Sequence, residues 1–68
     1  MLNAQMLSHA IKQRGLTTSK LADDIGVNRS TFYRKIKAGG GNFLLWEIES
    51  IIKLLGLTKH EAREIFLP

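Results

Sequence analysis

Apolar residues recur along this chain at the spacing of α-helices, in short segments that mostly end at a glycine. Side chains three or four positions apart share one face of a helix. The clearest period lies between residues 45 and 55, at Leu45, Ile48, Ile51, Ile52 and Leu55. We expect these five side chains to face the core from a central helix. No strand signal is present elsewhere in the chain, so the sequence predicts an all-α fold.

Five helices are predicted, and residues typical of helix ends mark the first three. The first helix covers about residues 3–14 and ends at Gly15, which an apolar residue follows, a pattern typical of glycine-terminated helices. Thr17 and Asn28 are suitable N-caps for the second and third helices. Gly26 ends the second helix after about two turns.

The last two helices follow the same rules. The helix around residues 45–55 ends at Gly56, and Thr58 with Glu61 forms a capping box for the fifth helix. The side chains expected to face inward from the other four helices are apolar and lie at helical spacing. They are Met6, Leu7, Ala10, Ile11, Leu21, Ala22, Ile25, Phe32, Ile36, Ala62, Ile65 and Phe66.

The short chain, of 68 residues with no cysteine and two histidines, offers few groups for chemistry. A chain of this length buries one small core, so we expect a single domain over residues 1–68. The lack of cysteine excludes disulfides, a thiolate zinc site and a cysteine nucleophile. Adjacent Asp23 and Asp24 point about 100° apart on a helix, a poor geometry for a catalytic carboxylate pair. We therefore expect no enzymatic activity, no metal, no cofactor and no small-molecule substrate.

The distribution of charge is more informative than the formal net charge of +4. Residues 1–38 carry seven Lys and Arg against two Asp, a net +5, whereas residues 39–68 carry three Lys and Arg against four Glu, a net −1. The densest positive segment is residues 29–37, with four basic residues and no acid. Such a stripe favours a polyanion partner, but a solvated helix face is an equally good interpretation of charge alone.

No segment approaches the roughly 18–20 consecutive apolar residues that cross a membrane as a helix. The first residues also lack the basic region and unbroken apolar region of a signal peptide. We therefore expect a cytoplasmic protein without a membrane partner.

Residues 16–32 read Leu-Thr-Thr-Ser-Lys-Leu-Ala-Asp-Asp-Ile-Gly-Val-Asn-Arg-Ser-Thr-Phe. The order Leu-Thr, Leu-Ala, Ile-Gly-Val and Arg-Ser-Thr resembles the helix-turn-helix of the Cro and lambda-repressor superfamily, also called the XRE family. With the helix before this segment and the two after it, the resemblance covers nearly the whole chain. It implies a compact five-helix lambda-repressor-like DNA-binding domain, with a helix-turn-helix formed by helices 2 and 3. It also implies a small Cro-like repressor, encoded by a phage or prophage, that binds a double-stranded DNA operator.

The resemblance further implies a recognition helix, from Arg29 to about Lys37, that lies in the major groove. Arginine can offer two donors to guanine, and a glycine amide can approach a phosphate closely. The residues expected to read bases are Asn28, Arg29, Ser30, Tyr33 and Arg34. The residues expected to contact phosphates are Thr17, Thr18, Ser19, Lys35, Lys37, Gly40 and Asn42. For Tyr33, half-burial against Phe32 is the alternative.

The sequence allows more than one surface for contacts with a second copy or with another protein. We expect a weak homodimer, at least on DNA, that reads two half-sites about 34 Å apart. Phe66 is expected in the core, whereas Leu67 and its neighbours either form a dimer seam or fold back on the core. Trp46 is expected to pack on residues 39–43, with a subunit contact as the alternative. An apolar surface around Trp46 would also suit an antitoxin or modulator that acts mainly through protein–protein interaction.

Overall fold

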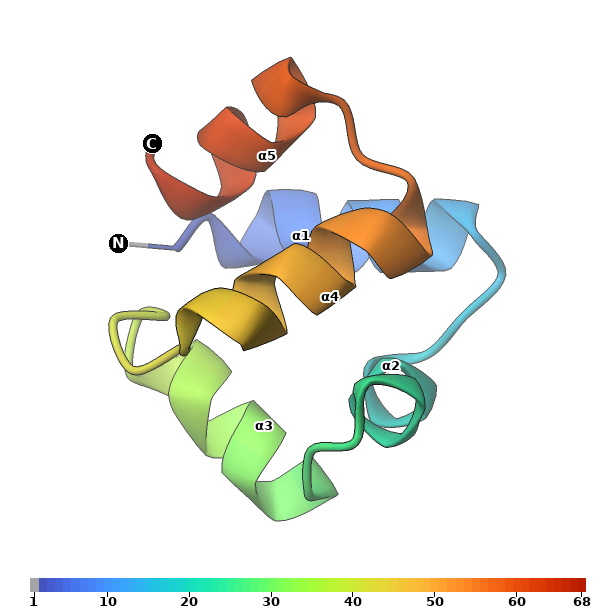
Figure 1. Ribbon diagram of the computed structural model, residues 1–68, viewed down its shortest axis with the longest axis vertical. Coiled ribbons are helices and arrows are strands. Elements are labelled where there is room, and N and C mark those ends of the chain that lie inside the picture. Colours follow the sequence, from blue (N-terminus) through green and yellow to red (C-terminus); the bar gives the residue numbers. More distant parts are fainter. Residues whose placement is uncertain (1) are drawn as a thin grey trace.

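The computed structural model describes residues 2–68 and contains α-helices joined by short connections (Figure 1). The five helices of this part of the chain are α1 (Ala4–Gln13), α2 (Thr18–Ile25), α3 (Arg29–Lys37), α4 (Leu45–Leu55) and α5 (Lys59–Phe66). These residues form no strand, so the prediction of five helices and an all-α fold is confirmed for them. None of the helices is long and apolar enough to cross a membrane.

In Figure 1, α4 crosses the middle of the molecule, with α1 and α5 on one side and α2 and α3 on the other. On the side of α1 and α5, a backbone hydrogen bond joins the residue before α1 to α5. The amide of Asn3 donates to the carbonyl of Ile65 at 2.7 Å. The radius of gyration over Cα atoms is 10.5 Å, so the helices form a compact globule. Helices α3 and α5 lie on opposite sides of the molecule, with α4 between them (Figure 1).

The predicted capping residues lie at the ends of the helices and form the expected hydrogen bonds. The side chains of Thr17 and Asn28 accept hydrogen bonds from amides three residues later, at 3.1 and 3.2 Å. Thr58 and Glu61 form a reciprocal capping box on α5. Gly26 has a φ of +80° in the left-handed region, which L side chains rarely adopt, so it ends α2 at low cost.

The core is built around Phe32, which is fully buried on the inner side of α3. Its ring lies edge-on to that of Phe43, with 5.5 Å between ring centroids. The other buried apolar residues come from the remaining four helices and from the turn before α5. They are Leu7, Ala10, Ile11, Leu21, Ala22, Ile51, Leu55, Leu57 and Ile65.

The prediction that Leu45 faces the core is wrong, because this side chain is 72% exposed. The row of α4 that faces the core consists of Glu47, Ile51 and Leu55, spaced four residues apart. Glu47 lies two positions after Leu45, which puts the two about 160° apart on a helix. A carboxylate therefore occupies the first core-facing position of α4, and Leu45 points away from it.

Trp46, which follows the connection between α3 and α4, is 48% exposed. The buried aromatic side chain of this region is Phe43. The side chain of Leu44, the N-cap of α4, cannot accept a hydrogen bond. Its own amide donates instead to the Glu47 carboxylate at 2.8 Å, so one buried carboxylate helps to begin this helix.

Candidate nucleic-acid interface

Helices α2 and α3 are joined by a three-residue turn, and α3 leaves it with its outer side facing solvent. The amide of Val27 donates to the carbonyl of Ala22 at 2.9 Å, while its side chain packs against the core. Asn28 then caps α3. The turn and the buried Phe32 together fix which side of α3 is exposed.

The outer face of α3, defined here as Ser30, Tyr33, Arg34 and Lys37, is exposed along the length of the helix. At 100° per residue these four positions lie opposite or beside the buried Phe32. Within residues 2–68, no carboxylate lies within ion-pair distance of Arg34 or Lys37. Both positive charges are therefore available to a ligand that approaches this face.

Tyr33 connects the outer face of α3 to the start of α2. Its hydroxyl lies 3.2 Å from that of Ser19 in a hydrogen bond. Beside this contact is an open hollow of about 320 Å³, lined partly by Thr17, Thr18 and Lys12. Lys12 belongs to α1 and is exposed. The sequence interpretation did not include Lys12, whose position at this hollow depends on how α1 packs against α2.

Several residues expected to contact DNA already have partners in the protein. The side-chain oxygens of Thr17 and Asn28 accept capping hydrogen bonds. The guanidinium of Arg29 donates two hydrogen bonds to Asp23, at 2.6 and 3.1 Å, from an exposed position. Hydrogen bonding from Arg29 lowers the pKa of Asp23 and thereby favours the charged carboxylate. Exposed ion pairs contribute little free energy, so a stronger anion can displace Asp23 from Arg29.

Two of the expected phosphate contacts do not fit the geometry. The ammonium of Lys35 lies 2.7 and 2.8 Å from the two carboxylate oxygens of Glu47, and its side chain is only 17% exposed. The amide of Gly40 already donates to the carbonyl of Lys35 at 2.9 Å. A Cβ placed at Gly40 would lie 2.6 Å from that of Leu2, so this residue packs against the N-terminal segment. Asn42, by contrast, is exposed.

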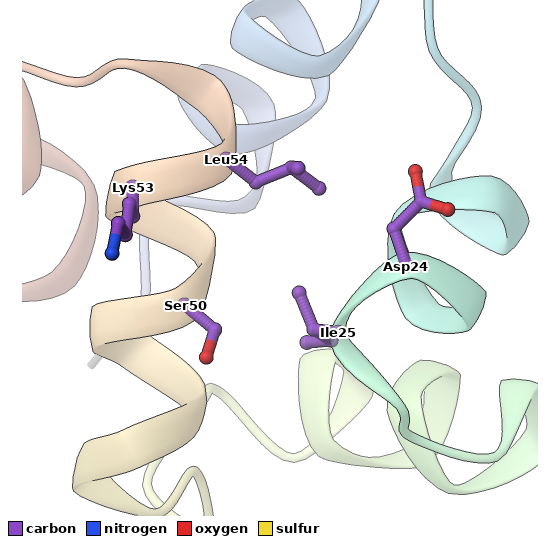
Figure 2. A pocket seen from close by; sticks show the side chains of 5 residues that line it. All are labelled: Asp24, Ile25, Ser50, Lys53 and Leu54. Carbon is purple, nitrogen blue, oxygen red and sulfur yellow. The ribbon is translucent and has the colours of Figure 1, made fainter.

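A second hollow, between α2 and α4, has no arrangement suited to catalysis (Figure 2). The carboxylate of Asp24 is paired with Lys20 at 2.6 Å, and the hydroxyl of Ser50 donates to the carbonyl of Trp46. Figure 2 shows the ammonium of Lys53 pointing away from Asp24. Among residues 2–68, no three His, Asp or Glu side chains lie close enough together to hold a metal ion.

Comparisons with known protein families, curated proteins and solved structures found no match to this chain.

Proposed function

We propose that this protein is a sequence-specific DNA-binding regulator of the small Cro-like kind, which represses transcription by occupying an operator. In this proposal α2 and α3 form the helix-turn-helix of a lambda-repressor-like domain. The observation that carries the proposal is the outer face of α3, which exposes Arg34 and Lys37, two cations without an ion-pair partner among residues 2–68, beside hydrogen-bonding side chains. A helix of this kind fits the width of the major groove of B-DNA.

Arg34 is the main candidate for reading a base. Its guanidinium can donate two parallel hydrogen bonds to the O6 and N7 atoms of guanine. Ser30 lies one turn closer to the start of α3 and offers a short donor or acceptor. Tyr33 presents its ring edge to a thymine methyl group or its hydroxyl to a phosphate. Arg29 and Asn28 join this set if DNA displaces their present partners.

The start of α2 supplies the candidate phosphate contacts. Helix N-termini attract anions because their first amides have no partner within the helix. Thr17, Thr18 and Ser19 lie at this end of α2, and Lys12 adds a positive charge from α1. Lys37 and Asn42 would contact the backbone beyond the other end of α3. Lys35 and Gly40 do not belong to this set, because both already form internal contacts.

The direct test is fluorescence-anisotropy binding to the DNA that flanks the protein's own gene, compared with scrambled DNA of equal length. We expect a preference of about 10³-fold or more for one flanking segment. Footprinting of that segment should show two half-sites about 34 Å apart, one for each copy of a homodimer. Equal and steeply salt-dependent affinity for both DNAs would contradict sequence-specific recognition.

Replacing Arg34 by alanine is expected to weaken binding to the preferred segment by about 1–3 kcal/mol and to relax the preference at one base pair. Anisotropy titrations against a set of single-base variants of that segment would measure both effects. Arg34→Lys is the matched control, since it keeps the charge but loses the planar fork of donors. An equal loss of affinity for all sequences would assign Arg34 to the phosphates instead.

Replacing Lys37 by alanine is expected to weaken binding to every sequence alike. Each phosphate contact that is lost reduces the slope of log affinity against log salt by roughly one unit. Lys53→Ala removes the same charge from the part of α4 distant from α3 (Figure 1) and should leave the slope unchanged. A slope unaltered by Lys37→Ala would remove this residue from the interface.

A second candidate function is that of an antitoxin or modulator that acts by binding another protein. Exposed Leu44, Leu45 and Trp46 at the start of α4 favour it, because small proteins rarely expose adjacent large apolar side chains. Absence of DNA binding at low salt, together with stoichiometric co-purification of one neighbour-encoded protein, would support this candidate over the first.

A further inference from the structure

Asp23 and Arg29 form an ion pair that joins the last turn of α2 to the start of α3. The pair uses one edge of the guanidinium, because Nε donates to Oδ1 at 3.1 Å and Nη2 donates to Oδ2 at 2.6 Å. Two parallel hydrogen bonds fix the orientation of a planar guanidinium. Both side chains nevertheless remain accessible, with 44% of Asp23 and 61% of Arg29 exposed.

The other edge of the Arg29 guanidinium is free. A guanidinium has more N–H groups than one carboxylate can bind. Among the described residues, Nη1 of Arg29 has no hydrogen-bond acceptor. Nη1 and the remaining N–H of Nη2 form another pair of parallel donors, at the end of the side chain. This pair matches the O6 and N7 atoms of guanine, so Arg29 can bind Asp23 and a base at the same time.

We infer that Asp23 is a positioning residue that sets the DNA specificity of Arg29. Its carboxylate holds the side edge of the guanidinium and leaves the end of the side chain to a guanine. Arg29 occupies the first position of α3, and the first residues of a recognition helix meet base edges. Because Asp23 acts through a base contact, its role rests on the proposed function.

The charge of Asp23 favours a base over a phosphate as the ligand of Arg29. The carboxylate repels an anion, whereas the edge of guanine is neutral and offers two acceptors. An arginine without such a partner can bind any nearby phosphate, and that contact carries no sequence information. Displacement of Asp23 by a phosphate would therefore add affinity for all DNA, and retention of the pair keeps the affinity specific.

Asp23→Ala tests this role in anisotropy titrations with the preferred segment, its single-base variants and scrambled DNA. We expect the preference at one base pair to fall about tenfold. Affinity for scrambled DNA should rise, and the slope of log affinity against log salt should steepen by roughly one unit, because Arg29 becomes available to a phosphate. Arg29→Ala should lose the preference at the same base pair, and the double variant should lose no more than Arg29→Ala alone.

Asp24→Ala is the matched control for the loss of one negative charge. Asp24 is the next residue of α2, but it pairs with Lys20 and lines the hollow toward α4 (Figure 2). This variant should change affinity for all sequences by the same factor and keep the preference. Asp23→Glu retains a carboxylate and should retain most of the preference as well. Circular dichroism would check that each variant is folded.

The outcomes separate the role of Asp23 from the proposed function. If the wild-type protein prefers one segment and Asp23→Ala keeps that preference at every base pair, only the role of Asp23 is overturned. An equal fall in preference with Asp24→Ala would assign the effect to net charge and also overturn it. A wild-type protein that prefers no segment would contradict both.

NMR of the wild-type protein bound to its preferred segment tests whether the ion pair persists on DNA. The Nε–H signal of Arg29, assigned by its loss in Arg29→Ala, should exchange slowly with water both in the free protein and in the complex. Asp23→Ala should make the same proton exchange rapidly. Slow exchange that is lost when the wild-type protein binds DNA would show that DNA displaces Asp23, and the positioning role would be wrong.

Discussion

Replacing Phe32 by alanine is expected to lower the free energy of unfolding by about 3–5 kcal/mol. Phe32 is fully buried, and its ring contacts that of Phe43 edge-on. Truncation removes the ring from the centre of the core and leaves a cavity that five short helices cannot readily fill. Because a domain of this size is stabilised by only a few kcal/mol, we expect the variant to be largely unfolded at room temperature. Urea titration followed by far-UV circular dichroism would measure the loss.

Leu54→Ala provides the comparison for Phe32→Ala, because Leu54 is a large apolar residue that is 42% exposed. We expect this control to cost about 1 kcal/mol or less. Similar losses for the two variants would contradict the central position of Phe32. Phe32→Leu retains much of the apolar volume and should lie between them. Phe32 also fixes which side of α3 faces solvent, so packing in the core supports the outer face that is proposed to bind DNA.

The turns and helix ends could be predicted because their signals are local in sequence. Gly26 and Gly56 adopt the left-handed conformation expected from their positions after apolar segments. Thr17, Asn28 and Thr58 accept the hydrogen bonds expected of N-caps. Each of these interactions spans three or four residues, so a single sequence contains all the information that they require.

The orientation of α4 could not be predicted in the same way. Its apolar residues cover more than half of the helix circumference, so periodicity alone allows several core-facing rows. Packing selects the row of Glu47, Ile51 and Leu55 and leaves Leu45 on the surface. The sequence did contain one signal for this orientation. Glu47 lies three residues after the N-cap of α4, where a carboxylate can accept a hydrogen bond from the amide of the N-cap residue.

The candidate site shows the same division between local and long-range information. Helical periodicity, which predicts that Phe32 and Ile36 face inward, agrees with the exposed positions of Ser30, Arg34 and Lys37 on α3. It could not predict that Lys35, between them in sequence, is bound to a carboxylate twelve residues away. Nor could it place Lys12 beside the start of α2. Which cations are available to DNA is therefore decided by tertiary contacts, although residue type and period select the candidates.

Two contacts attach the inner side of α3 to the rest of the protein. Phe32 anchors it to the core through apolar packing, and Lys35 anchors it to α4 through Glu47. The ammonium of Lys35 also lies 5.9 Å from the centroid of the Phe43 ring. On a helix Phe32 lies about 160° from Arg34 and Lys35 about 100° from it, so both contacts can fix the outer face without occupying it. A regulator that reads bases would benefit from such a rigid helix.

Replacing Glu47 by alanine is expected to lower the free energy of unfolding by about 3 kcal/mol. The substitution removes the partner of the Lys35 ammonium and the acceptor of the Leu44 amide at once. We place the loss at the lower end of the range for broken buried pairs, because Lys35 retains 17% exposure and can turn toward water. Urea titration at neutral pH would measure it. A loss below about 0.5 kcal/mol would show that the pair does not stabilise the fold.

The contribution of Glu47 should also depend on pH in a defined direction. Burial alone would raise the pKa of this carboxyl, but hydrogen bonds from Lys35 and the Leu44 amide, together with the Lys35 charge, hold it below its ordinary value of 4.5. A carboxyl whose pKa is lowered by folding stabilises the fold above its unfolded-state pKa, and the stabilisation is lost as the pH falls toward the folded-state value. Wild-type stability should therefore decline below about pH 5, and Glu47→Gln, which cannot ionise, should decline less steeply. Parallel declines for the two proteins would assign the acid sensitivity to other carboxylates, such as Asp23 and Glu61, whose pKa values folding also lowers.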